Sequence, residues 1–389
     1  MAELLEVIES FKAEQASVGK LFGGEGRRVQ EAAQAHQLHA EKLVEAMDFL
    51  DAIESGRKPM HLLQEAMTTS DFPLLFADIL DRQLLATYEE TQPTWQAYCK
   101  RGTVRDFRNV KRFAVDGAES TLDPVKERSE YPEDELRTSK DEYSVKKYGR
   151  RLDLSWETLI NDDLDSFRDI PARLGRAARR SESKFATGLF VDANGPHASL
   201  YTVGNANKVT GNPVLSIDGL QKAFLTLANQ KDTDGEPIVI DGVTLVVPPA
   251  LEVTARNILN AIHIEMTDQG GSASQKLIAQ NWMSNRVTLQ VEPYIPIVAS
   301  SANGNTSWFL FANPGTGRPA LELGFLRGHE EPALYERMPN ARRVSGGGDA
   351  MESFEDDSRA WRIRHVFGGT RLTSTGGAKA TVASNGSGS

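Results

Sequence analysis

Ser181 and Lys184 have the S-x-x-K spacing, which on a helix places a hydroxyl and an amine on one face, where the amine could activate the serine as a nucleophile. The S-D-N and K-T-G segments that accompany this spacing in serine enzymes are missing from the chain. A four-residue pattern also recurs often by chance. We therefore interpret the pair as part of a polar helix face and assign no catalytic residue, with a hydrolase as the alternative that an activity screen would test.

Histidine and aspartate residues form two groupings that could bind a metal ion. His36 and His39 lie three apart on a predicted helix, but no second cluster of ligands follows them. Asp162, Asp163 and Asp165 could hold a hard cation, yet they precede a predicted helix, where carboxylates cap free amides and oppose the helix dipole. No phosphate-binding glycine loop can be aligned. We predict neither a metal nor a cofactor.

Clustered arginine and lysine residues are the third group that could do chemistry. A guanidinium group binds either phosphates of a nucleic acid or carboxylates of a protein. The chain has 54 acidic and 44 basic residues and a formal net charge of −10, which disfavours a surface devoted to DNA. We therefore favour contacts with protein carboxylates, with local DNA contact and plain solvation as alternatives.

The composition describes a globular protein. The chain has 389 residues, of which 40% are hydrophobic and 25% charged, enough to bury a normal core. Its single cysteine, Cys99, excludes an internal disulfide framework and favours a reducing cytoplasm. The N-terminus is acidic from Glu3 onward and lacks a secretory signal, and no apolar run reaches the ~18 residues needed to span a bilayer. We expect a soluble protein without membrane contact.

Residues 1–66 are predicted to form an acidic helical extension. Two amphipathic helices flank a glycine-rich linker, and the segment holds 12 acidic and 7 basic residues. Each helix has one modest apolar face and needs a partner surface. Packaged DNA would repel such a segment, so we expect it to dock on protein.

The middle of the chain predicts an arm followed by a long helix. Residues 113–150 are strand-like at both ends with a charged centre, a pattern typical of a hairpin arm that cannot form its own core. A helix of about 20 residues, roughly 30 Å long, should follow, with Pro171 near its start. Its predicted buried stripe is Ile170, Leu174, Ala178, Phe185 and Leu189.

The C-terminal half predicts a mixed fold. Residues 214–317 alternate helix and strand, as in a compact α/β unit, and residues 318–371 are read as strands. The tail, residues 372–389, lacks an apolar run that could order it. The fold class expected from these elements is α+β.

Several segments resemble a known family. TSDFPLLFADILDRQLLATYEE, YSVKKYGRRLDLSWETLINDDL, FRDIPARLGRAARRSE, SWFLFANP and AWRIRHVFGGTRL look like segments of Mu-type major head subunits and of the capsid part of prohead protease/capsid fusions. The resemblance covers about residues 68–371. It implies the HK97-like capsid fold of tailed bacteriophages, with an N-terminal extension (1–66), an N-arm (67–112), an extended loop (113–152), a peripheral domain with the spine helix (153–213 and 318–371), an axial domain (214–317) and a flexible tail (372–389).

The resemblance also implies a function. It implies a structural protein, not an enzyme, that self-assembles into pentamers and hexamers and then into an icosahedral shell around double-stranded phage DNA. The partners it implies are further copies of the chain, portal, scaffold or protease and decoration proteins, and DNA through weak local contacts. The implied location is the virion capsid, assembled in the host bacterial cytoplasm. An encapsulin-like nanocompartment subunit, which encloses protein cargo, is the alternative with the same fold.

The basic residues then become candidate subunit contacts. They are Arg101, Arg105, Arg108, Lys111, Arg112, Lys126, Arg128, Lys146, Lys147, Arg150 and Arg151.

Overall fold

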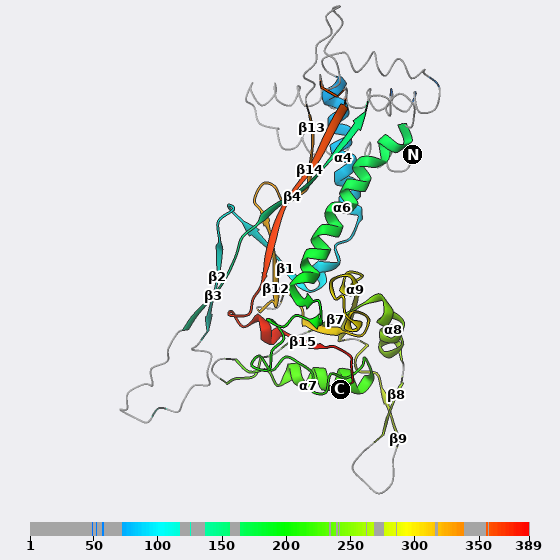
Figure 1. Cartoon of the computed structure of the whole chain (residues 1–389). Coiled ribbons are helices and arrows are strands. Elements are labelled where there is room, and N and C mark those ends of the chain that lie inside the picture. The colour runs from blue at the N-terminus through cyan, green and yellow to red at the C-terminus, as the bar shows by residue number, and fades with distance from the viewer. Residues whose placement is uncertain are drawn as a thin grey trace, which may run out of the picture. The chain divides into compact units, whose positions relative to one another are not determined.

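The computed structural model describes residues 72–116, 125, 137–155, 164–232, 235–238, 240, 242–261, 263–267, 276–284, 286–315, 318–337, 355–356 and 358–388, together with residues 49, 52 and 57 (Figure 1). Most of the expected extension 1–66, with His36 and His39, lies outside these residues. So do Lys126 and Arg128 in the centre of the expected arm, and Asp162 and Asp163.

The chain divides into two compact units. The first contains Met1–Gln92, Lys147–Arg179 and Glu331–His365, and the second contains Pro93–Lys146, Arg180–Glu330 and Val366–Ser389. Helix α6 (Leu164–Phe190) and strand β14 (Ser358–Arg371) contribute residues to both. The mixture of helices with several sheets is of the α+β class, as expected from the sequence.

A four-stranded sheet forms the centre of the second unit. Strand β7 (Val243–Val247) pairs in parallel with β10 (Val287–Val291) and antiparallel with β11 (Trp308–Ala312), and β15 (Thr381–Ser384) pairs antiparallel with β11. Every residue of β7 and β11 is buried, which explains why these segments are continuous apolar runs in the sequence.

Two helices complete the core of this sheet. Helix α7 (Ile217–Ala228) begins at Ser216, whose hydroxyl accepts a hydrogen bond from the Gly219 amide at 3.1 Å, a typical N-cap. It buries Leu220, Ala223 and Leu227, and helix α8 (Glu252–Asn260) buries two further residues against the same cluster. The spacing of these apolar residues follows one helix face.

A second set of strands in this unit supports a hairpin. Strand β1 (Cys99–Val104) pairs in parallel with β12 (Leu321–Leu326), and β12 pairs antiparallel with the end of β14. Strands β2 (Val110–Asp116) and β3 (Arg137–Tyr143) form an antiparallel pair within the expected arm. Its tip, apart from Val125, lies outside the described residues.

The first unit joins two helices to three strands. Helix α4 (Phe72–Glu90) and the first part of α6 pack with β4 (Lys146–Ser155), β13 (Ala333–Glu336) and the start of β14. Their core contains Leu84, Tyr88, Leu174, Ala178 and Ile363. Helix α4 begins at Phe72 with Pro73 in its first turn, where proline is tolerated because the missing N–H has no helical partner.

The remaining elements are short. They are η1 (Thr94–Ala97), β5 (Val191–Asp192), β6 (Gly195–Pro196), η2 (Pro249–Leu251), β8 (His263–Thr267), β9 (Lys276–Gln280), α9 (Ile295–Val298), η3 (Ala302–Asn305) and η4 (Gly377–Ala380).

The structure differs from the sequence-based expectation at two places. Helix α6 begins at Leu164 and has 27 residues, so Pro171 lies inside it rather than near its start, and Asp165 belongs to the helix. The segment 372–389 was expected to be a flexible tail, but Val382 is fully buried and β15 extends the four-stranded sheet. Four small residues need no apolar run of their own when a neighbouring strand supplies both hydrogen bonds and a core.

The buried stripe of α6 leads to a first prediction. Leu174 is 5% exposed in the core of the first unit, whereas Arg173 beside it is exposed. We expect Leu174→Ala to lower the free energy of unfolding by about 2–5 kcal/mol through lost burial and a residual cavity. Urea unfolding of purified protein would measure the change, with Arg173→Ala as the control. An unchanged midpoint for Leu174→Ala would exclude this packing.

Candidate subunit-contact sites

The base of the β2–β3 hairpin presents two chemically different faces. Arg112, Asp141 and Tyr143 alternate along the strands with Phe113 and Lys140. The first three are partly or fully buried, whereas Phe113 and Lys140, which are paired across the strands, are exposed. Because side chains alternate between the faces of a strand, one face of the hairpin is attached to its own subunit and the other is open.

Glu322 anchors the attached face. Its Oε1 accepts a hydrogen bond from the Tyr143 hydroxyl at 2.6 Å and from Arg112 Nε at 2.7 Å. The Glu322 side chain is 5% exposed, and burial, reinforced by this carboxylate, raises the pKa of Tyr143. A charged acceptor makes both hydrogen bonds stronger than neutral ones. We call Arg112, Tyr143 and Glu322 the arm anchor.

Two glycines make room for the arm anchor. A Cβ atom at Gly102 would lie 2.2 Å from Glu322 Oε1, and one at Gly324 would lie 2.3 Å from the Tyr143 hydroxyl. These residues face each other across β1 and β12. Only glycine leaves this space at both positions, so the sheet is shaped to accept the anchor.

Asp141 forms a second attachment on the same face. Its carboxylate accepts hydrogen bonds from the amides of Ser374 and Thr375 at 3.1 and 3.0 Å and from the Thr375 hydroxyl at 2.8 Å. Asp141 is 7% exposed, so these bonds replace its hydration. The hairpin is therefore held at its base by two independent polar contacts.

The second unit also contains a buried carboxylate that is not part of the arm. Glu292 is fully buried, and its oxygens accept hydrogen bonds from the Tyr98 hydroxyl at 3.1 Å and the Tyr294 amide at 3.3 Å. Burial raises the pKa of Glu292 above its ordinary value and also raises that of the neighbouring Cys99 thiol. A carboxyl group in this environment favours the protonated form.

The raised pKa of Glu292 predicts a pH dependence. The folded protein holds this proton to higher pH than the unfolded chain, so the free energy of unfolding should fall as pH rises from about 4.3 through the raised pKa. Glu292→Gln keeps an acceptor for Tyr98 and should flatten this decline. Thermal melts between pH 4.5 and 8 would test it, with exposed Glu331→Gln as the control. An identical pH profile for wild type and Glu292→Gln would contradict the prediction.

The residues considered for catalysis lie on the surface of α6. Ser181 and Lys184 are both exposed on α6, and neither lines either of the two cavities described below. Among the described residues, no group of three or more His, Cys, Asp or Glu side chains could hold a metal ion. No helix in the described part of the chain has the length and apolar character needed to cross a membrane.

The predicted contact residues lie mostly on exposed surface. Arg101 forms an exposed ion pair with Glu330 at 2.9 Å, and Arg108 forms one with Asp106 at 3.1 Å. Arg112 belongs to the arm anchor. The other predicted contacts within the described residues are exposed, namely Arg105, Lys111, Lys146, Lys147, Arg150 and Arg151.

The residues predicted for the α6 stripe divide between the two units. Leu174 and Ala178 are buried, and Ile170 is partly buried beside them, in the first unit. In the second unit Leu189 is buried and Phe185 is partly buried, with its ring 5.5 Å from that of Phe367.

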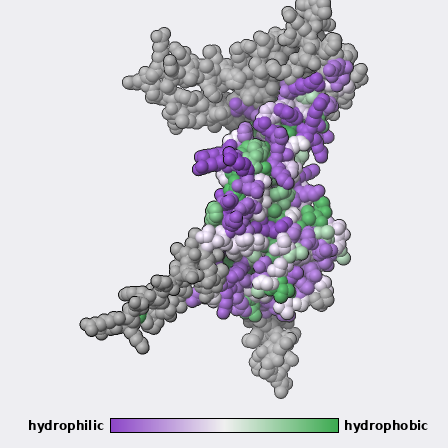
Figure 2. Space-filling view, turned by 60° about the vertical axis from the view of Figure 1, so that its left-hand side comes forward, coloured by the Kyte–Doolittle hydropathy of each residue, from purple (hydrophilic) through white to green (hydrophobic). Residues whose placement is uncertain are grey.

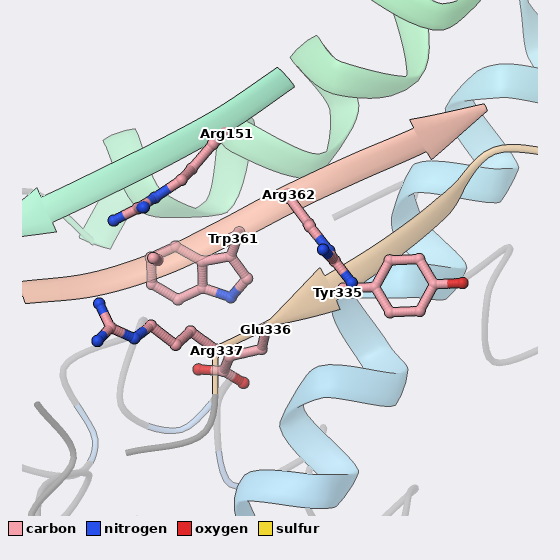
Figure 3. Close-up of a pocket in the computed structure, with 7 residues that line it drawn as sticks. Arg151, Tyr335, Glu336, Arg337, Trp361 and Arg362 are labelled. Atoms are coloured by element: carbon pink, nitrogen blue, oxygen red, sulfur yellow. The ribbon is translucent and has the colours of Figure 1, made fainter. Parts of the chain in front are cut away.

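A basic pocket in the first unit brings Arg151 together with residues that sequence reasoning did not select (Figure 3). The cavity has a volume of about 310 Å³, and it is lined by Arg151, Tyr335, Glu336, Arg337, Ala360, Trp361 and Arg362. We call it the arginine pocket. A smaller apolar cavity is lined by Leu80, Ile170, Pro171, Leu334 and Trp361.

The surface of the described residues is largely polar on the face shown in Figure 2. On the face seen in Figure 2, hydrophilic residues predominate over the described parts, and apolar residues form separated areas. Exposed apolar side chains nevertheless include Phe107 and Phe113 near the arm base. Contacts through the visible face are expected to be largely polar.

Comparison with known proteins identifies the family. Residues 139–380 match the family model described as phage capsid protein, which covers well over half of the chain. Comparison with curated proteins finds no match.

Comparison with solved structures also finds similar chains. A chain of Microbacterium phage Oxtober96 is 11% identical with a TM-score of 0.44, covering 75% of this chain and 89% of that one. A chain of Mycobacterium phage Patience is 12% identical with a TM-score of 0.44, covering 82% and 90%. The SrpI encapsulin of Synechococcus elongatus PCC 7942 is 11% identical with a TM-score of 0.41, covering 76% and 89%.

The match to the family model defines the class as a structural component of a virus shell. The chain belongs to the phage capsid protein family. The family expected from the sequence resemblance is thereby confirmed, and the chain is a component of the virion capsid.

Proposed function

We propose that this chain is the major capsid protein of a tailed bacteriophage and assembles into pentamers and hexamers that close into an icosahedral shell of the HK97 type around double-stranded DNA. The match of residues 139–380 to the phage capsid family carries this proposal. The doubly attached hairpin supports it, because an arm fixed at its base and open on its other face is suited to contact a neighbouring copy.

The proposal extends to partners and place of assembly. The exposed basic residues Arg105, Arg108, Lys111, Arg150 and Arg151 would form polar contacts between subunits. Portal, scaffold or protease and decoration proteins would be further partners, and DNA would make only weak local contacts with a chain of net charge −10. Assembly would take place in the host bacterial cytoplasm.

Electron microscopy of particles tests the function. The full chain would be isolated from the cells in which it is naturally made and imaged, and the nuclease-resistant content of the particles would be analysed. Closed shells that contain double-stranded DNA are expected. Closed shells filled with protein cargo would instead support an encapsulin-like compartment, and subunits that never form particles would contradict both.

The acidic extension has a proposed role in assembly, argued from its sequence. Its apolar stripes favour docking on protein, either on the basic region from Arg101 to Arg112 of a neighbouring subunit or on another extension, so it would act as a built-in scaffold or clamp between capsomers. Removal of residues 2–64 should reduce particle yield or change shell geometry in electron micrographs. Normal yield and geometry would exclude the assembly role.

A further inference from the structure

The arginine pocket combines a basic rim with an aromatic wall. In Figure 3 the Arg151 and Arg337 side chains lie on either side of the Trp361 indole, and Arg362 extends toward Tyr335. The guanidinium carbon of Arg362 is 5.1 Å from the centre of the Tyr335 ring. These groups come from β4, β13 and β14 and the residue after β13, so a single sheet positions them.

The pocket offers cations that are not neutralised. Arg151 pairs with Asp153 at 2.6 Å, but both side chains are about half exposed, so the pair is weak and can exchange partners. Within the described part of the chain, Arg337 and Arg362 have no carboxylate partner. In a protein with 54 acidic residues, two such guanidinium groups beside an indole indicate a site for an external anion.

The lining favours an acidic peptide over DNA. Glu336 lines the same cavity, and Asp153 lies beside Arg151. These carboxylates would repel a continuous row of phosphates, but they can accept hydrogen bonds from the amides of a peptide. Trp361 lines the pocket but is only 3% exposed, so the partly exposed Tyr335 ring is the aromatic surface on which an apolar side chain of the peptide would pack.

One segment of this chain has the matching chemistry. Residues 349–357, with the sequence DAMESFEDD, contain five acidic residues, no basic residue and one phenylalanine. In the single chain Glu355 and Asp356 are exposed. Neither residue lines the arginine pocket of its own subunit.

We propose that the arginine pocket binds the acidic segment 349–357 of a second copy of this chain. This inference rests on the proposed function, because a shell brings identical copies of the chain into contact. The pocket and the acidic segment would form one of the contacts that link these copies. A segment on one copy and a pocket on the next form a head-to-tail interface, which closes into a ring when the rotation between copies permits.

Peptide binding to the unassembled full-length protein tests the pocket directly. A fluorescent peptide of residues 347–358 would be titrated with wild-type protein and with Arg337→Glu/Arg362→Glu, and anisotropy would be measured at low salt. We expect at least tenfold weaker binding to the variant and weaker binding to wild type as salt rises. Lys222→Glu/Arg286→Glu is the control, because it makes the same charge change at two exposed sites of the other unit and should bind like wild type.

Charge reversal and competition separate the alternatives. A peptide with lysine at positions 356 and 357 should prefer the Arg337→Glu/Arg362→Glu protein. Equal binding of the original peptide to wild type and variant, with unchanged melting temperatures, would overturn the proposal. Displacement of the peptide by a short DNA duplex that needs the same two arginines would instead define a nucleic-acid site. If the variant does not fold, Arg337→Gln/Arg362→Gln replaces it.

Mixed assembly tests whether the contact joins two copies. Asp356→Lys/Asp357→Lys subunits and Arg337→Glu/Arg362→Glu subunits should each assemble poorly, and their mixture should assemble better than either. No recovery on mixing would overturn a contact between copies. If wild type forms no shells yet binds the peptide, the proposed function fails and the pocket assignment stands. If shells form without peptide binding, only the pocket assignment fails.

Discussion

Replacing residues 117–136 with a short glycine-containing turn should abolish shell formation while the subunit stays folded. These residues connect β2 to β3 beyond the attached base of the hairpin. Their replacement leaves intact the two contacts that hold the base. These contacts are the arm anchor and the hydrogen bonds that Asp141 accepts from residues 374 and 375. A longer deletion, 117–147, would remove Asp141 and Tyr143 and confuse loss of the arm with loss of stability.

The effect on assembly should be large because the replaced residues are the part of the arm that lies beyond the attached base and would reach a neighbouring subunit. Ten residues in each direction can reach at most roughly 33 Å when fully extended, which is far enough to cross onto a neighbouring subunit. Loss of a contact of this length would remove a substantial share of a typical interface of about 1,600 Å².

The measurement needs both an assembly and a folding readout. Particle yield would be counted by negative-stain microscopy, and folding would be followed by the midpoint of urea unfolding. An unchanged midpoint with no particles is the expected result. Particles of normal number and shape would show that the arm does not link subunits. A matched control is the replacement of residues 268–275, the connection between β8 and β9 in the same unit, by a similar turn.

Local sequence patterns were enough to predict the elements that carry their own apolar signal. The WFLFA run of β11 and the SIDGLQKAFLTLA segment of α7 both lie within residues 214–317, which the sequence predicts to alternate helix and strand. In the first the whole strand is buried, and in the second an N-cap precedes one apolar face. The β15 segment TVAS has neither feature, and its burial depends on pairing with β11.

The candidate sites were predictable only in part, because they too depend on contacts between residues that are distant in the sequence. Arg112 and Arg151 were selected as basic residues, but nothing local connects Arg112 to Glu322, which lies in the apolar strand LELGFL. The only sequence signal for the arm anchor is a charged residue and a glycine inside that strand. Trp361 and Arg337 are far apart in the sequence and meet through the pairing of β13 with β14.

Glu322→Ala should be the most destabilising single change at the arm base. The substitution leaves the Tyr143 hydroxyl buried without its acceptor and removes the carboxylate from Arg112, whose side chain is one-third exposed. Removing the buried partner of such an ion pair is expected to lower the free energy of unfolding by about 3 kcal/mol. The loss is not larger because the Arg112 guanidinium can still be hydrated. Glu142→Ala, an exposed carboxylate on the open face of β3, should change it by less than about 0.5 kcal/mol.

A double-mutant cycle shows whether the anchor acts as a unit. Tyr143→Phe removes one hydrogen bond to a charged acceptor and should lower the free energy of unfolding by about 1.5–3 kcal/mol in the wild-type background. In the Glu322→Ala background the hydroxyl has already lost its acceptor, so the same change should have little effect. Chemical unfolding of the four proteins measures the coupling. Additive effects of the two changes would mean that Tyr143 and Glu322 stabilise the fold independently and that the arm base is not held by a shared carboxylate.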